Sequence, residues 1–137
     1  MTKECSISIQ GVEGSEKITA PGRYHEKDGR CYVFFEAQTE DGPEKCSLKF
    51  DEASLEYTRS GAIRTGIILK TGEKTFAEYS TPYGSFQARF HTGSIRLLRE
   101  EGQICLDAEY MLSLNGSGED PGRVAIEITA SEGRRDS

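Results

Sequence analysis

The 137-residue chain has no tryptophan, two histidines, four cysteines and no long apolar run. A membrane-spanning helix needs about 20 consecutive, predominantly apolar residues, and no segment comes near that length, so we expect no membrane association. The first residues include Glu4 and lack the apolar stretch of a secretory signal peptide. We therefore expect a cytoplasmic location.

The cysteines show no metal-binding or redox spacing. None is arranged as Cys-x-x-Cys, and no histidine lies at zinc-finger spacing from one of them. Each falls within an alternating apolar run, where cysteine acts as a small buried hydrophobic side chain. We expect four reduced and mostly buried thiols: Cys5, Cys31, Cys46 and Cys105.

Familiar catalytic and cofactor-binding motifs are absent as well. The chain has no Gly-x-Ser-x-Gly motif and no acidic calcium loop, and His25 and His91 are expected to face away from the apolar side of their strands. The glycine-rich segment 115–122 leads into an expected strand, so it lacks the helix N-terminus that binds phosphate. We expect a non-enzymatic protein without a metal or a cofactor.

Acidic side chains outnumber basic ones by 23 to 17, which gives a formal net charge of −6. This charge repels a phosphate backbone, so we expect no nucleic-acid partner. Hydrophobic residues make up 35% of the chain and charged residues 29%. That composition is typical of strands that each turn one face to water.

A two-residue period runs through much of the chain. Apolar residues occupy alternate positions at 86–90, 104–114 and 124–130, a pattern typical of strands with one buried face. Turn-forming pairs separate such runs about every ten residues. These pairs are Asp28-Gly29, Ser60-Gly61, Thr71-Gly72, Thr92-Gly93, Glu101-Gly102 and Asn115-Gly116.

These signals predict an all-β fold of about ten strands with little or no helix. Short hairpin connections favour closure, because a closed barrel has no exposed edge. We predict a single closed antiparallel meander β-barrel over residues 4–130, followed by a flexible C-terminal tail at 131–137. An aligned sandwich is the alternative, and segment 115–122 is the one loop long enough for a crossing connection.

Three segments resemble the YwiB-like family of bacterial proteins: RSGAI at 59–63, STPYGSF at 80–86 and EYMLSLNG at 109–116. The resemblance extends over about residues 4–130, and STPYGSF is its most specific part. It implies a calycin-like, that is lipocalin-like, barrel in a small cytoplasmic protein without an assigned function, and it implies no catalytic residues. The chain departs from the lipocalin outline, because it lacks a Gly-x-Trp motif and a helical segment after the last strand.

The barrel interior is the place where the sequence offers a site for a small apolar or amphipathic ligand. Candidate polar residues for the interior or the rim are Tyr57, Arg64, Glu78, Tyr83, Arg89 and Tyr110. Glu78 shares a strand face with Phe76, so it points inward if Phe76 does, and it would then pair with Arg64 or Arg89. Alternation does not tell which face is inside. Small barrels are also often filled by side chains, and the sequence is compatible with both arrangements.

A second hypothesis is a protein–protein interaction or structural module with a filled barrel. Segment 31–37 is apolar on both faces, which a strand with one face in water does not need. Within STPYGSF, Pro82 and Gly84 suit a hairpin turn, whereas Tyr83 is not required by that turn and is expected at the barrel rim. Both a monomer and a homodimer are compatible with the sequence.

Overall fold

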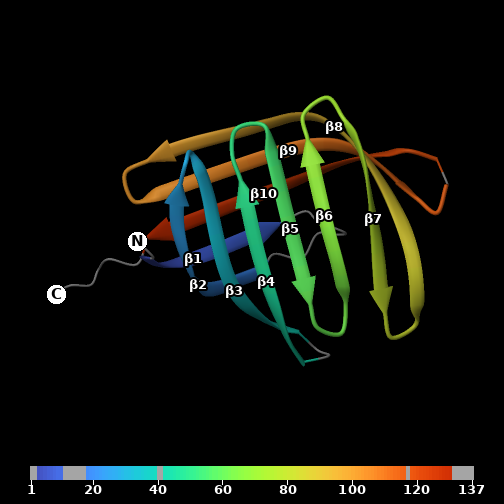
Figure 1. The fold of residues 1–137 in the computed structure, drawn as a ribbon, viewed down its shortest axis with the longest axis horizontal. Helices are drawn as coiled ribbons and strands as arrows, with labels where there is room; N and C mark the ends of the chain where they lie inside the picture. The colour runs from blue at the N-terminus through green and yellow to red at the C-terminus, as the bar shows by residue number, and fades with distance from the viewer. Residues whose placement is uncertain (1–2, 11–17, 40–41, 117, 131–137) are drawn as a thin grey trace.

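The computed structural model describes residues 3–10, 18–39, 42–116 and 118–130. These residues form ten strands in a ring (Figure 1). The strands are β1 (Lys3–Gln10), β2 (Ile18–Lys27), β3 (Arg30–Thr39), β4 (Gly42–Phe50), β5 (Ser54–Ser60), β6 (Arg64–Lys70), β7 (Lys74–Thr81), β8 (Gly84–Glu100), β9 (Gln103–Leu114) and β10 (Asp120–Ala130). In this part of the chain no helix is long and apolar enough to cross a membrane. The predicted tail at 131–137 lies outside the described residues.

Every strand pairs antiparallel with its neighbours in the chain, and β1 closes the ring. On one side β1 pairs with β10, with Ile7 opposite Ile128, and on the other side it pairs with β2, with Ile7 opposite Ala20. The prediction of a closed antiparallel meander barrel of about ten strands is confirmed, and the sandwich alternative is wrong. Each strand therefore has two hydrogen-bonded neighbours, as closure requires.

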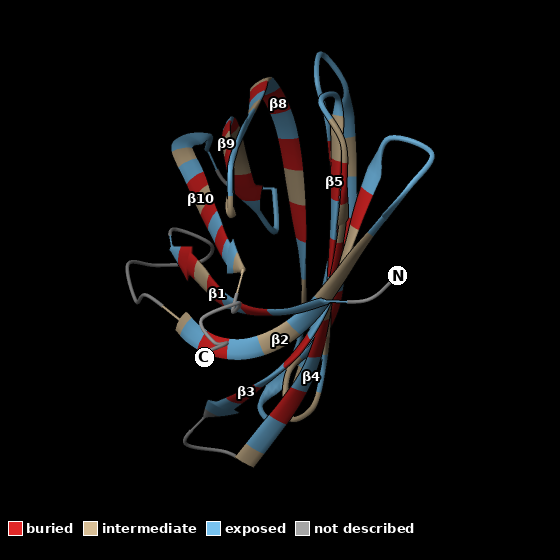
Figure 2. Ribbon diagram, turned by 90° about the vertical axis from the view of Figure 1, so that its left-hand side faces the viewer, coloured by how far each residue is buried: buried red, intermediate tan, exposed pale blue. Residues whose placement is uncertain are grey.

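Burial alternates along the strands and places the apolar set inside the ring (Figure 2). On β9, Ile104, Leu106, Ala108 and Tyr110 are buried, whereas Asp107 between them faces outward. The inner positions are rich in β-branched and aromatic residues, which pack well on a pleated surface. The two-residue period thus marks the inner face from Ile104 to Tyr110. At the end of β9 it fails, because Ser113 is buried and Leu114 is 42% exposed.

A β-bulge interrupts β8 where the sequence predicted a turn. The pair Thr92-Gly93 does not end a strand, because β8 runs on from Gly84 to Glu100 and its register on β9 shifts between Thr92 and Ser94. In Figure 1, β8 to β10 cross steeply behind β3 to β6. A bulge bends a long strand, so that its two halves can follow different parts of the barrel wall. The predicted turn at this pair is therefore wrong, although Gly93 does mark an irregular point in the strand.

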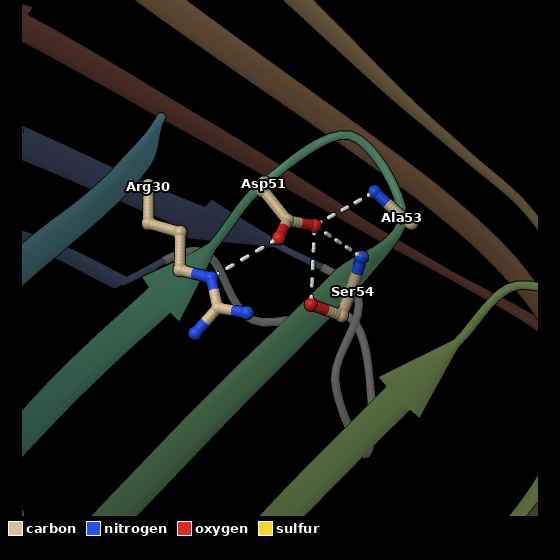
Figure 3. Close-up of polar contacts among 4 residues, drawn as sticks. All are labelled: Arg30, Asp51, Ala53 and Ser54. Atoms are coloured by element: carbon tan, nitrogen blue, oxygen red, sulfur yellow. Dashed lines mark hydrogen bonds and ion pairs between the residues drawn. The ribbon is translucent and has the colours of Figure 1, made fainter. Parts of the chain in front are cut away.

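The turn between β4 and β5 is held by Asp51 (Figure 3). One carboxylate oxygen accepts hydrogen bonds from the backbone N–H groups of Ala53 and Ser54 at 2.8 and 2.9 Å, and the other lies 3.4 Å from Arg30 Nε. Burial raises the pKa of Asp51, but these hydrogen bonds and the Arg30 charge outweigh it and hold that pKa below its usual range. The contact with Arg30 also ties this turn to β3.

Gly122 on β10 leaves room for the ring of Tyr110 on β9. The two residues are opposite each other in the ladder, and a Cβ placed at Gly122 would lie 2.4 Å from the Tyr110 Cε1 atom. The ring is also packed edge-to-face on Phe90, with 5.2 Å between the ring centroids. Tyr110 therefore has little freedom to move away from a larger neighbour.

We predict that Gly122→Ala lowers the free energy of unfolding by about 1–3 kcal/mol, because the added methyl group overpacks against a held ring. The matched control is Gly66→Ala on β6, where nothing lies within 4 Å of an added Cβ. The control should change stability by less than about 1 kcal/mol, and in the stabilising direction. Urea unfolding followed by tyrosine fluorescence measures both variants, and equal losses would contradict the packing account.

Candidate functional site

The space enclosed at the centre of the barrel is about 10 Å³. It is bordered by apolar and aromatic side chains: Ile9, Leu55, Tyr57, Ile67, Leu69, Phe90, Tyr110, Val124 and Ile126. One water molecule needs roughly 10–15 Å³ of such space. This part of the interior is therefore filled by side chains, the second of the two arrangements that the sequence allowed.

The predicted polar residues divide between the inside and the outside of the wall. Tyr57 and Tyr110 are buried and border the central space. Arg64 and Glu78 are exposed, and Arg89 is half-buried on the outward face of β8. The structure thus brings two of the candidates together in the interior and leaves three charged ones on the outer surface.

Glu78 faces outward, because the condition for an inward Glu78 is not met. It depended on Phe76, which is 71% exposed and faces outward. The inner positions of β7 are taken by Ala77 and Tyr79, and the Tyr79 ring stacks on Phe86 with 4.7 Å between centroids. A large stacked aromatic pair fixes the phase of the β7–β8 hairpin, so Glu78 and its supposed pairing with Arg64 or Arg89 cannot lie inside.

Tyr83 lies at the tip of the β7–β8 hairpin and is 95% exposed. The turn is built by its neighbours, since Thr81 Oγ1 accepts from the Tyr83 N–H at 3.1 Å and donates to the Gly84 carbonyl at 2.8 Å. Gly84 has a φ of 130°, a conformation that favours glycine. The predicted hairpin turn is confirmed, and the Tyr83 side chain takes no part in these contacts.

An ion pair does lie on the inner side of the wall, between Glu44 on β4 and Arg59 on β5. Arg59 Nε donates to Glu44 Oε1 at 3.0 Å and its Nη2 donates to Oε2 at 3.2 Å. Glu44 is 3% exposed. Such a bidentate pair compensates much of the cost of burying both charges. The sequence analysis considered a buried carboxylate–arginine pair only for Glu78, and only if Phe76 pointed inward.

The sequence does contain a signal for this pair. Cys46, Leu48 and Phe50 form the inner face of β4, and one step of two residues back along that face reaches Glu44. Arg59 follows Leu55 and Tyr57 on β5 in the same way. The sequence analysis named neither residue as a site candidate.

The segment RSGAI, noted for its family resemblance, surrounds this pair. It begins with Arg59, and a Cβ on its Gly61 would lie 2.6 Å from the Glu44 Cγ atom. The glycine therefore makes room for the buried glutamate. Arg59 and Gly61 of this segment thus have a structural explanation, which is the packing of the ion pair against the barrel wall.

Cys46 lies beside the ion pair, opposite Arg59 in the β4–β5 ladder. Burial and, to a smaller extent, the Glu44 charge raise the pKa of the Cys46 thiol to about 11, against the opposing effects of Arg59 and Tyr57. Cys5, Cys31 and Cys46 are buried free thiols and Cys105 is half-buried, as predicted. A thiol with a raised pKa is a poor nucleophile at neutral pH.

Two shallow grooves lie on the outer face of β8, β9 and β10. One, of about 670 Å³, is bordered by His91, Glu109, Met111, Pro121 and Arg123 among others. The other, of about 480 Å³, includes Leu98 and Cys105. Asp107 and Arg123, which pair at 2.5 and 2.6 Å, contribute to the borders of these grooves. Within the described residues, no group of three or more His, Cys, Asp or Glu side chains could hold a metal ion.

Apolar side chains are also exposed on the opposite wall of the barrel. Phe34 on β3 is 49% exposed, Ile68 on β6 is 38% exposed, and Phe76 on β7 is the most exposed of the three. The two-sided apolar character predicted for segment 31–37 corresponds to buried Cys31, Val33, Phe35 and Ala37 inside and Phe34 outside. A single exposed apolar residue is ordinary, but two on adjacent strands form a patch.

Comparison with known proteins gives one family and one fold. A family model described as "Domain of unknown function (DUF1934)" matches residues 2–128. The Uncharacterized beta-barrel protein YwiB of Bacillus subtilis (strain 168) is 29% identical over 102 residues, which are 73% of this chain and 72% of that protein. The crystal structure of the ywiB protein from Bacillus subtilis matches with a TM-score of 0.71 at 22% identity, covering 95% of this chain and 90% of that chain.

We predict that Arg59→Met lowers the free energy of unfolding by about 3–5 kcal/mol, because it leaves the Glu44 carboxylate buried without its partner. The double variant Glu44→Gln/Arg59→Met should recover much of this loss. Arg123→Met is the matched control, since it removes an equally bidentate pair at the surface and should cost far less. Urea unfolding tests all three, and similar losses for Arg59→Met and Arg123→Met would contradict the burial argument.

The thiols predict a pH dependence at alkaline pH. Burial raises the pKa of Cys5 and Cys46 from 9.0 to about 11. The folded protein therefore keeps these thiols neutral after the unfolded chain has begun to ionise, so their contribution is complete below pH 9 and is lost as the pH rises to about 11. Between pH 8 and pH 10.5, Cys46→Ala should lose less unfolding free energy than the wild type. Equal losses in the two proteins would show that Cys46 makes no contribution.

Proposed function

We propose, for a chain that belongs to the DUF1934 family of domains of unknown function, that the barrel interior is a structural core and that the outer surface binds a protein partner. The observation that carries this proposal is the enclosed space of about 10 Å³ at the barrel centre. Sites for small molecules usually measure about 300–1,000 Å³. The apolar ligand that the fold suggested would need most of the central side chains to move.

The outer face of β5 to β8 is the surface best suited to a partner. We call it the Ile68/Phe76 face and define it by four outward side chains: Glu56, Ile68, Phe76 and Arg89. An exposed phenylalanine next to an exposed isoleucine is typical of an interaction site, because aromatic anchors supply much of the energy at protein interfaces. Charged residues on both sides of this apolar centre would form its polar rim.

A small amphipathic ligand, the other predicted function, is supported by a different surface. The groove of about 670 Å³ beside the β8 bulge has the volume of a small-molecule site. Met111 and Pro121 supply apolar contacts there, and His91, Glu109 and Arg123 supply polar ones. This candidate ranks second, because the groove is shallow and its Arg123 is already paired with Asp107.

The proposal also covers nucleic-acid binding and catalysis, which depend on the net charge and on the thiol pKa values. A net charge of −6 supports a protein that avoids nucleic acid, and the raised thiol pKa values support one without a cysteine nucleophile. We propose a non-enzymatic cytoplasmic protein. The relation to calycins that the sequence resemblance implies remains a prediction.

The experiment compares two exposed apolar residues on opposite walls of the barrel. We expect Phe76→Ser to abolish capture of the partner from a bacterial lysate, because it removes the aromatic anchor of the Ile68/Phe76 face. Leu98→Ser, which changes a 57% exposed residue beside the second groove, should leave capture unchanged. Circular dichroism confirms that both variants fold, and quantitative mass spectrometry of the captured proteins gives the result. Loss with Leu98→Ser alone, or no difference between the variants, would overturn the proposal.

A further inference from the structure

The four side chains of the Ile68/Phe76 face form one row across four strands. In the β5–β6 ladder Glu56 is opposite Ile68, and in the β7–β8 ladder Phe76 is opposite Arg89. Between β6 and β7 the ladder contains the single pair Arg64–Ser80. Ile68 and Phe76 each lie four residues from this pair toward the hairpin, so we place them side by side. The row therefore reads acid, apolar, apolar, base.

Glu56 and Arg89, at the two ends of this row, are charged residues that a partner could pair with. Among the described residues, neither Glu56 nor Arg89 forms an ion pair with another part of the chain. Glu56 is exposed, and Arg89 is half-buried beside the exposed ring of Phe76. The row thus presents one negative and one positive charge on either side of an apolar centre.

We propose that the partner of this face is a second copy of the same chain, an inference that rests on the function proposed above. A two-fold axis parallel to the strands, midway between β6 and β7, reverses the order of the row in the second copy. Glu56 then faces Arg89 of the second copy, and Ile68 faces Phe76 of the second copy. Because such an interface is isologous, each contact occurs twice.

The order of charges selects this orientation. A two-fold axis perpendicular to the strands would place Glu56 against Glu56 and Arg89 against Arg89, which is repulsive. Both axes keep the strands of the two facing sheets nearly aligned, the common geometry for sheets that pack face to face, so the charges decide between them. When the row is turned end to end, its negative end meets its positive end. A row of this kind matches a second copy of itself without any change, whereas an unrelated protein would have to supply the matching charges separately.

The neighbouring rows are compatible with this packing. Gly66 lies beside Ile68 on β6, and open space above it leaves the face flat there. In the proposed dimer, Gly66 faces Glu78 of the second copy, which brings that carboxylate near Arg64. Lys70 and Lys74 face each other at the hairpin end. Both are exposed, and at the rim their long side chains can turn into solvent, so this repulsion costs little.

Charge reversal tests the inference by sedimentation velocity over a range of protein concentrations. Glu56→Arg and Arg89→Glu each turn an attractive contact into a repulsive one, twice per dimer. Each should raise the dimer dissociation constant by about tenfold or more. An equimolar mixture of the two variants should dimerise again, because each variant's new charge faces an opposite charge on the other. Lys45→Glu, which reverses an exposed charge on β4 away from this row, is the control and should dimerise like the wild type.

The outcomes separate this inference from the function on which it rests. A wild-type protein that stays monomeric at high concentration overturns the second copy, and the proposed interaction face then stands or falls with the Phe76→Ser capture experiment. A wild-type dimer that neither charge reversal weakens, or single variants that the mixture does not rescue, overturns the proposed axis. Rescue by mixing is a result that damage to the fold of either variant would not produce.

Discussion

Strand β1 is the element on which the rest of the structure depends, because its hydrogen bonds to both β10 and β2 turn an open sheet into a ring. Closure gives every strand two neighbours and makes one face of every strand an inner face. The inward positions must then supply the whole hydrophobic core, since the described chain has no helix to cover a sheet. The strict two-residue period of the sequence is the consequence of this single constraint.

A ring of ten strands would be wide enough for a ligand if it were round, yet its centre holds about 10 Å³. Two features explain the difference. Strand β8, which carries a bulge, runs with β9 and β10 across the direction of β3 to β6 (Figure 1), and large side chains such as Phe50, Tyr79 and Phe90 occupy inward positions. These large inward side chains leave about 10 Å³ among the residues that border the barrel centre.

Strand number, pairing order and the two faces of each strand were predictable from the sequence because they follow from local periodicity and turn chemistry. Gly93 was misread because a glycine that allows a bulge and a glycine that allows a turn give the same local signal. The side of the wall on which Glu78 lies stayed open, because alternation assigns residues to faces without saying which face is inside. That choice depends on contacts between distant strands, such as Tyr79 on Phe86 and Glu44 with Arg59.

The Ile68/Phe76 face lies over the least regular part of the barrel wall. Between β6 and β7 the ladder contains the single pair Arg64–Ser80, whereas adjacent ladders contain seven and eight pairs. A wall with few backbone hydrogen bonds depends on its side chains for cohesion, and local opening is easiest where such bonds are few. A partner packed across Ile68 and Phe76 would bury apolar surface on both strands and hold them together. The proposed binding at this face would therefore stabilise this part of the barrel, because a ligand that binds only the closed wall stabilises it by mass action.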